Sequence, residues 1–322
     1  MTTRNDNHST GPLAGIKVVD LTHFQAGPTC TMILGDMGAE VIKVEVPGSG
    51  DHGRDMSPTI DGLSAFFAAY NRNKMSTTLN LKTEKGKELL RRLVERADML
   101  AENFRPGVMA RLGFSYDDLR QINPGIIMVS SSGFGQTGPY AGRAGFDTVA
   151  QAMSGLMSVT GYEDRPPARA GPAIADSTAG FFGAIGAILA LYHKLKTGEG
   201  QHVDISLLEG QLVLMAYTIL RQSLGVEVKR GGSHSTNVSP ADAFPTADGK
   251  YVYIFAQDSN HFPLICRLMG RPELADDPLY NSIVGRMENR DELSDIVSQW
   301  TRTMNADALE ATLHEAGLAY GR

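Results

Sequence analysis

The stretch Ile16-Lys17-Val18-Val19-Asp20-Leu21 decides the fold, because it is a short apolar run that predicts a buried strand. Residues 22–28, Thr22-His23-Phe24-Gln25-Ala26-Gly27-Pro28, form a loop after it, and residues 29–37 are typical of a helix. The turn Gly38-Ala39-Glu40 then leads into a second apolar run, Val41-Ile42-Lys43-Val44-Glu45. A strand, a helix and a strand in such close succession indicate a βαβ unit and therefore a parallel sheet.

The same alternation continues along the chain. Loop 22–28 lacks the GxGxxG pattern of dinucleotide-binding proteins, so Glu45 is interpreted as a strand-end charge rather than a ribose-binding acid. Residues 12–225 are predicted to form a large, doubly wound, Rossmann-like α/β domain. Its further strands are expected at 77–81, 99–101, 125–130 and 201–206, and its further helices at 65–70, 82–97, 146–156, 181–192 and 207–224.

The rest of the chain divides into three shorter regions. Residues 1–11 are polar and predicted to be a disordered tail, and residues 226–249 are a Gly/Ser/Asn-rich linker or lid. Residues 250–322 are predicted to form a smaller, mainly helical α+β domain. Its strand is expected at 251–255 and its helices at 261–269, 289–303 and 306–316.

Composition excludes several classes of protein. The net charge of −6 over 322 residues argues against a general nucleic-acid binder. Cys30 and Cys266 are too far apart to suggest a disulfide framework, and the His, Cys and acidic residues do not cluster at metal-ligand spacing, so no metal and no redox cofactor are expected. The longest apolar run, residues 181–192, is shorter than the roughly 20 residues of a membrane span. Without a secretory signal, a reducing cytoplasmic setting is expected.

Several polar side chains follow predicted strands. In a parallel α/β sheet, ligands bind beyond the carboxyl ends of the strands, which places loop 22–28 at a binding edge. Lys82, Asn103, Arg105 and Arg111 also follow strands or lie on the next helix. Any one of these is more often a solvated surface residue, but together they indicate an anionic ligand that carries phosphates.

Asp176 lies shortly before the apolar run 181–192, at or just before the N-terminus of a predicted helix. There the free backbone amides and the helix dipole favour an ionised carboxylate, which suits nucleophilic catalysis through an acyl anhydride. The alternative is structural, because Asp176-Ser177-Thr178 contains three ordinary N-cap residues. Taken alone, capping is the commoner role of such residues.

Taken together, these motifs resemble those of the family III CoA transferases, also called the CaiB/BaiF family, a group that includes formyl-CoA transferase, carnitine CoA-transferase and alpha-methylacyl-CoA racemase. The resemblance extends from about residue 12 to residue 322, and it depends on the order and spacing of its motifs rather than on any one of them. These motifs lie at residues 13–22, 25–28, 38–45, 73–74, 102–107, 175–176 and 196–201.

The resemblance implies a CoA transferase of the EC 2.8.3 type, with acyl-CoA and a small carboxylic acid as substrates and no permanently bound cofactor. Asp176 matches the family's catalytic aspartate, which forms an aspartyl anhydride and then an aspartyl-CoA thioester. Gln25 would orient the acyl carbonyl. The positions that match the CoA site of the family are Gln25, Ala26, Leu79, Lys82, Asn103, Phe104, Arg105, Arg111 and Phe134.

The chain departs from individual branches of the family. The racemase branch has a His-Asp pair where this chain has Phe146-Asp147, and because phenylalanine cannot carry a proton, an acyl-CoA racemase or isomerase is disfavoured. Formyl-CoA transferase has an arginine at the position of Val46 in this chain. It also has a lysine near the position of Ser132, which this chain lacks, so formyl or oxalyl specificity is also disfavoured. Gly231-Gly232 matches its glycine-rich loop only weakly. The acid is therefore expected to be a small dicarboxylate or a related acid.

Family members form an interlocked homodimer in which each chain threads through a ring made by the other. Their C-terminal part returns to the first domain and closes that ring. Because this chain ends at residue 322, we expect a C-terminal return segment to be missing. That expectation keeps a third alternative open, a catalytically silent CoA-binding protein.

Overall fold

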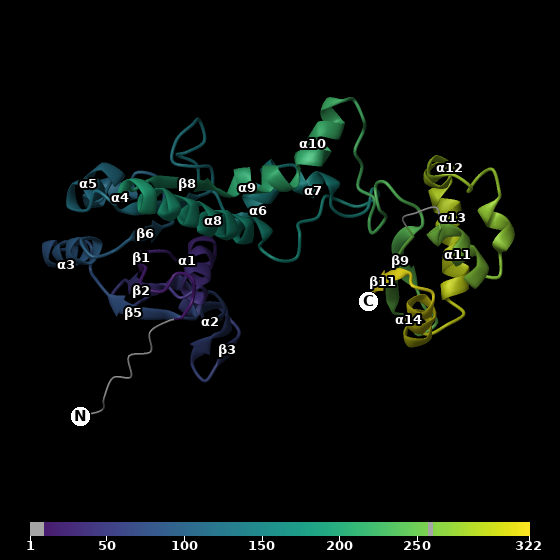
Figure 1. The fold of residues 1–322 in the computed structure, drawn as a ribbon, viewed down its shortest axis with the longest axis horizontal. Helices are drawn as coiled ribbons and strands as arrows, with labels where there is room; N and C mark the ends of the chain where they lie inside the picture. Colours follow the sequence, from purple (N-terminus) through teal and green to yellow (C-terminus); the bar gives the residue numbers. More distant parts are fainter. Residues whose placement is uncertain (1–9, 257–259) are drawn as a thin grey trace. The chain divides into compact units, whose positions relative to one another are not determined.

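The computed structural model describes residues 10–256 and 260–322, which fall into two compact units (Figure 1). Unit 1 extends to Ser158 and continues from Ala168 to Val228, and unit 2 comprises Val159–Pro167 and Lys229–Arg322. Of the predicted tail 1–11, residues 1–9 lie outside the described residues. The domain limits 12–225, 226–249 and 250–322 remain predictions.

Unit 1 contains a six-stranded parallel sheet of strand order β5-β2-β1-β6-β7-β8. The order reverses between β1 and β6, which are neighbours in space although two other strands of this sheet separate them in sequence. This arrangement confirms the predicted doubly wound α/β fold. The strands are β1 (Lys17–Asp20), β2 (Glu40–Glu45), β5 (Lys74–Thr78), β6 (Met99–Glu102), β7 (Ile127–Ser132) and β8 (His202–Ser206).

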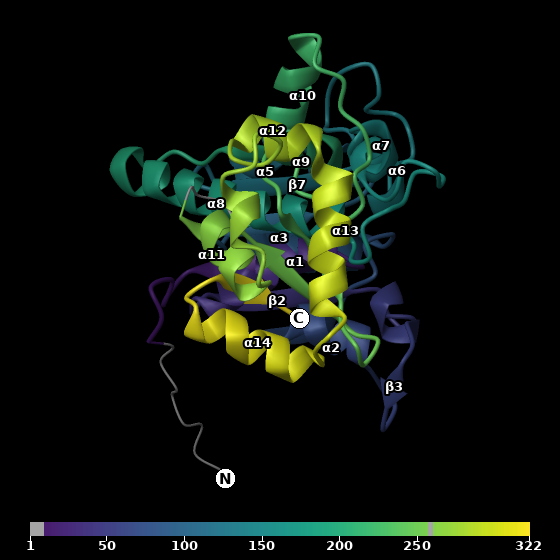
Figure 2. The ribbon, with the colours of Figure 1, turned by 90° about the vertical axis from the view of Figure 1, so that its right-hand side faces the viewer.

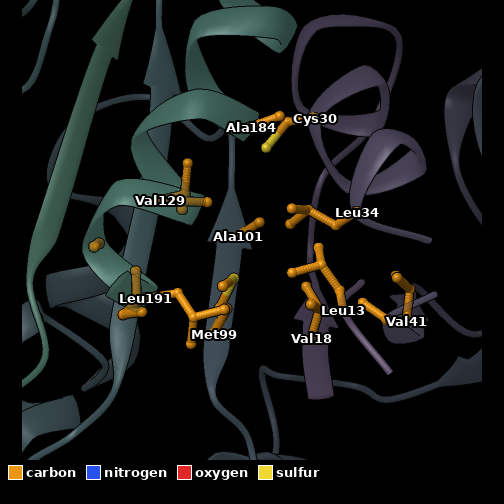
Figure 3. Close-up of a cluster of buried hydrophobic side chains, with 14 residues drawn as sticks. Leu13, Val18, Cys30, Leu34, Val41, Met99, Ala101, Val129, Ala184 and Leu191 are labelled. Carbon is orange, nitrogen blue, oxygen red and sulfur yellow. The ribbon is translucent and has the colours of Figure 1, made fainter. Parts of the chain in front are cut away.

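Helices pack on both faces of this sheet. On one face, side chains from α1 and α8 meet those of β1, β6 and β7 in the cluster shown in Figure 3, which includes Leu34, Met99 and Leu191. On the other face, a second cluster includes Leu90 of α3 and Leu119 of α5. The helices are α1 (Ala26–Asp36), α2 (Ala65–Asn71), α3 (Glu84–Val94), α4 (Val108–Leu112), α5 (Tyr116–Ile122), α6 (Asp147–Met153), α7 (Leu156–Val159), α8 (Ile174–Thr197), α9 (Leu207–Leu214) and α10 (Ala216–Ser223). A 3-10 turn (His52–Asp55) and a hairpin of β3 (Thr59–Ile60) and β4 (Leu63–Ser64) follow β2.

Helix α8 packs closely on α1 because both present small residues at the contact. A Cβ added at Gly180 would lie 2.5 Å from Cβ of Thr29, and one added at Gly183 would lie 3.2 Å from Sγ of Cys30. The helix is longer than the apolar run 181–192 and could cross a membrane by length and composition alone. Half of its most apolar stretch is buried within the protein, as in a core helix.

Several predicted elements differ from the structure. The strand expected at 77–81 lies earlier, at Lys74–Thr78, and the helix expected at 146–156 is divided between α6 and α7. The expected single helix over 207–224 is interrupted at Met215, where φ is −87° and ψ is 0°. Met215 is buried whereas α10 buries none of its residues, so the chain turns from the core towards solvent there. The predicted linker 226–249 contains strand β9 (Ala241–Pro245), whose Phe244 is 1% exposed.

Unit 2 is built on a three-stranded antiparallel sheet of order β11-β10-β9, with β10 (Tyr251–Phe255) in the centre and β11 (Ala319–Gly321) at one edge. Its helices, seen in Figure 2, bury Val297, Leu309 and Leu313 against this sheet. This is the smaller α+β region that the sequence predicts. The helices are α11 (His261–Leu268), α12 (Ile283–Glu288), α13 (Arg290–Thr301) and α14 (Ala306–Glu315), with a 3-10 turn at Pro272–Ala275.

Candidate active site

The site lies where the strand order of unit 1 reverses. The loops after β1 and β6 meet there, because the side chain of Asn103 bonds both backbone groups of His23. Its Oδ1 accepts from the His23 amide at 2.9 Å, and its Nδ2 donates to the His23 carbonyl at 2.7 Å. A crevice at such a reversal is the usual ligand site of an open α/β sheet.

A cavity of about 580 Å³ opens between these loops and α8, and its lining belongs entirely to unit 1. It brings together six of the residues that the sequence singles out, from three separate segments of the chain. These are Gln25, Ala26, Asn103, Phe104, Arg105 and Asp176.

The other four predicted CoA-contacting residues do not line this cavity. Leu79 is half-buried just after β5, and Lys82 is exposed in the turn that leads to α3. Arg111 is exposed in the last turn of α4. Phe134 follows β7 and packs edge-on against Tyr140 at 5.8 Å between ring centroids.

Asp176 is the third residue of α8 and lies in its first turn. The helix is capped from outside, because Oδ1 of Asp147 accepts from the amides of Ala175 at 2.7 Å and Asp176 at 3.3 Å. Ser177 and Thr178 bond carbonyls of their own helix. The alternative interpretation of Asp176-Ser177-Thr178 as N-caps is therefore wrong.

The electrostatics of Asp176 differ from the expectation of a readily ionised carboxylate. Burial, followed by the nearby charge of Asp147, raises the pKa of Asp176 to about 7. These two effects outweigh the helix dipole, because desolvation penalises a charge more than a dipole at one helix end stabilises it. The site thus holds a carboxyl group that is balanced between its two protonation states near neutral pH.

Gln25 connects α1 to the first turn of α8. It is buried at the N-terminus of α1, and its Nε2 donates to Oγ of Ser177 at 3.1 Å and to the carbonyl of Ala173 at 3.3 Å. Its side-chain amide is thereby fixed beside the turn that carries Asp176.

Sequence reasoning missed two contributors to the cavity. From the sequence, Asp147 was considered only as the residue that follows Phe146. In the structure it caps α8, and its Oδ2 accepts a hydrogen bond from Nε2 of Gln151 at 2.7 Å. The four-residue spacing of Asp147 and Gln151 on one helix face was the available signal. Arg143 also lines the cavity, and its guanidinium lies 4.2 Å from the ring centroid of Tyr140.

Within residues 10–256 and 260–322, no group of three or more His, Cys, Asp or Glu side chains could hold a metal ion. Cys30 and Cys266 are buried free thiols, and burial raises their pKa values to about 12 and about 11.

Proteins of similar sequence are described as CoA-transferases. The family described as CoA-transferase family III matches residues 13–322. The chain is 42% identical to the succinyl-CoA–D-citramalate CoA-transferase of Chloroflexus aurantiacus, over 97% of this chain and 78% of that protein. It is 41% identical to the acetyl-CoA:oxalate CoA-transferase of Acetobacter aceti, over 97% of this chain and 80% of that protein.

A solved structure of a related protein has the same fold. The crystal structure of a CaiB/BaiF family protein from Brucella suis superimposes with a TM-score of 0.87 at 38% identity, covering 97% of this chain and 84% of that one. The match over nearly the whole chain, in sequence and in fold, shows that this protein belongs to CoA-transferase family III and is a CoA transferase.

Proposed function

We propose that the protein moves CoA from an acyl-CoA thioester to a free carboxylate through covalent intermediates on Asp176. One observation carries this proposal: Asp147 caps α8, so the Asp176 carboxylate is left facing a cavity that it shares with Gln25. Among the described residues, no recorded hydrogen bond occupies that carboxylate. A carboxylate in this setting is available as a nucleophile.

The proposed reaction consists of four successive acyl-transfer steps. The Asp176 carboxylate attacks the thioester carbonyl, forming an aspartyl anhydride and releasing CoA thiolate. The thiolate attacks the aspartyl carbonyl of the anhydride, releasing the donor acid and leaving an aspartyl-CoA thioester. The acceptor carboxylate attacks this thioester to give a new anhydride, and the released thiolate then takes the new acyl group. Asp176 returns as a carboxylate, and Gln25 orients the acyl carbonyl throughout.

The CoA moiety is proposed to extend from the cavity along the loops after the strands. Arg105 lies at the cavity, and Lys82 and Arg111 are exposed on neighbouring segments of the same unit. Guanidinium and ammonium groups suit its phosphates and pyrophosphate. Apolar contacts to CoA are proposed for Ala26, Leu79, Phe104 and Phe134, and a polar one for Asn103.

The acids are proposed to be small dicarboxylates, and Arg143 to bind the carboxylate that does not react. Within the described residues Arg143 has no recorded ion pair, and it lines the cavity beside Phe146. Phe146 lies where the racemase branch has its proton-transferring histidine, so it favours transfer over racemisation.

Arg143→Met is expected to raise KM for succinate about 10- to 100-fold, because a charge-assisted hydrogen bond contributes roughly 1.5–3 kcal/mol. KM for butyrate, which has the same chain length and one carboxylate, should stay unchanged. Initial rates with the two acids test this, with Arg143→Lys as the charge-preserving control. An equal rise in KM for both acids would show that Arg143 does not recognise the second carboxylate.

The activity of the wild type is expected to fall at low pH with an apparent pKa of about 7 in kcat/KM. The sign follows from Asp176: the nucleophile is the carboxylate, and its pKa is raised to about 7, so the reactive form is lost as the pH falls below that value. Asp147→Asn keeps the capping oxygen but removes the charge that contributes to this shift. The acid limb should then move to lower pH, whereas an unmoved limb would argue against coupling between the two carboxyl groups.

The proposed mechanism is tested by trapping the covalent intermediate. The protein is incubated with succinyl-CoA, treated with hydroxylamine or borohydride, and analysed by intact-protein mass spectrometry. An adduct that maps to Asp176 and is absent from Asp176→Ala is expected. A protein that binds CoA but forms no adduct would indicate the catalytically silent alternative.

We also propose that the chain works as an interlocked homodimer in the cytoplasm. The outer side of α8 exposes Leu189 and Leu195, and α10 exposes Leu220, so unit 1 presents apolar surface that a second copy would bury. Light scattering coupled to gel filtration is expected to give the mass of two chains. A monomer that transfers CoA at full rate would contradict the dimer.

A further inference from the structure

The loop that carries Gln25 has a strained backbone. Phe24, the residue before it, has a φ of 62°, which lies in the left-handed region that bulky side chains rarely adopt. Such a conformation persists only where the surroundings hold it. The contacts of Thr22, His23 and Phe24 therefore decide where Gln25 sits.

One buried ion pair holds this loop on both sides of His23. Nζ of Lys43 lies 2.8 Å from Oδ2 of Asp51, and each side chain is 1% exposed. Lys43 also donates to the carbonyl of Thr22 at 2.7 Å. Oδ1 of Asp51 accepts from the amide of Phe24 at 3.2 Å.

A second buried pair holds the ends of the same segment. Nζ of Lys74 lies 3.0 Å from Oδ2 of Asp20 and donates to the carbonyl of Pro28 at 3.0 Å. The amide and hydroxyl of Thr22 donate to Oδ1 of Asp20. Burial by itself would raise the pKa of Asp20, but the charges of Lys74 and Lys43 and these hydrogen bonds lower it to about 2. Asp20 is thus charged at neutral pH.

None of these four charged side chains lines the cavity, so they cannot bind substrate directly. Buried ion pairs also contribute little net stability, since replacing one with apolar residues of similar volume is often neutral for the free energy of unfolding. The two pairs fix the path of the loop, because each of the four side chains makes a hydrogen bond to a backbone group between Thr22 and Pro28.

We propose that the buried pairs Lys43–Asp51 and Asp20–Lys74 are positioning elements that hold the loop Thr22–Gln25, and so place the Gln25 amide beside Asp176. The inference rests on the proposed function, in which Gln25 orients the acyl carbonyl. It assigns a role to four charged groups that the covalent chemistry itself does not use.

The test replaces one pair by apolar residues, Lys43→Met with Asp51→Leu. The thermal midpoint is expected to stay close to the wild-type value, while kcat falls about 10- to 100-fold, because a small misplacement of an orienting group costs up to that factor. KM for the acyl-CoA donor should change less than twofold. Amide hydrogen exchange of the peptide that contains Thr22–Gln25 should become about tenfold faster, since two of its backbone anchors are lost.

A control makes the same change in the pair Lys194–Asp98, also 2.8 Å long but with side chains 20% and 27% exposed. It joins the last turn of α8 to the residue before β6, at the opposite end of that strand from the loop. Lys194→Met with Asp98→Leu should leave kcat and the exchange of the loop unchanged. Asp51→Asn provides a milder variant, because it keeps an oxygen for the Phe24 amide while removing the charge opposite Lys43. It should lower kcat less than the double replacement does.

A double-mutant cycle with Gln25→Ala decides whether the effect passes through Gln25. If the pair positions that amide, replacing the pair should cost little further activity once Gln25 is gone. An unchanged kcat, or the same fold loss with and without Gln25, would overturn the inference. A wild type that transfers no CoA would instead overturn the proposed function, and hydrogen exchange would still report whether the pair holds the loop.

Discussion

Asp176→Asn is expected to abolish CoA transfer, with a loss of about 10⁴-fold or more in kcat, because no covalent intermediate can form without the nucleophile. The amide occupies nearly the same volume as the carboxylate, so acyl-CoA binding should persist. Transfer of a labelled acyl group between succinate and succinyl-CoA measures the first effect, and equilibrium binding measures the second. Intact mass must confirm that the asparagine has not reverted by deamidation.

The same variant should be more stable than the wild type at alkaline pH. In the fold the pKa of Asp176 is about 7 instead of 3.8, so the folded state holds the proton more tightly than the unfolded chain. This favourable contribution is complete at acidic pH and is lost as the pH rises through about 7. Asparagine does not ionise, so its thermal midpoint should exceed that of the wild type at pH 8 and match it at pH 4. If Asp176→Asn keeps a tenth of the wild-type kcat, the assignment of Asp176 as the nucleophile is contradicted.

Gln25→Ala is expected to lower kcat about 10²-fold, because misplacement of the reacting groups that Gln25 is proposed to orient can cost that factor. Nε2 of Gln25 is fixed by Ser177 and the carbonyl of Ala173, beside the nucleophile. Because most of this interaction belongs to the transition state, KM for acyl-CoA should change little. Steady-state kinetics with varied donor and acceptor measure both parameters.

Gln211→Ala is the matched control for this change. Gln211 is also a buried glutamine whose Nε2 donates to α8, here to Oγ1 of Thr178 at 2.8 Å, but it does not line the cavity. Its removal should destabilise the fold by about 1–3 kcal/mol while changing kcat less than a few-fold. Equal losses of kcat in the two variants would mean that Gln25 acts only by supporting α8.

Much of the fold follows from local features of the sequence. The strand-helix-strand succession over residues 16–45 and its continuation to residue 206 need only apolar runs and short turns, and the six-stranded sheet follows from them. The same rule places Gln25, Asn103 and Arg105 at one sheet edge, where the structure brings them to one cavity.

Features that depend on contacts distant in sequence could not be predicted in this way. Lys43 is charged and stands in the middle of a strand, and its complete burial is explained by Asp51 and by the carbonyl of Thr22, both distant in sequence. The cap on α8 comes from Asp147, 28 residues before Ala175. The direction of the pKa shift at Asp176 depended on that same neighbour and on burial, neither of which the local sequence records.

The close packing of α8 on α1 has a consequence for redesigning the enzyme. With Gly180 and Gly183 packed against Thr29 and Cys30, neither helix can take a larger side chain at this contact, which lies next to the end of α8 that carries Asp176. Arg143 and Phe146, by contrast, belong to the loop segment that ends where α6 begins. Libraries aimed at new acids should therefore vary that loop and leave the helix pair untouched, so that substrate choice can evolve while the reacting carboxyl group stays in place.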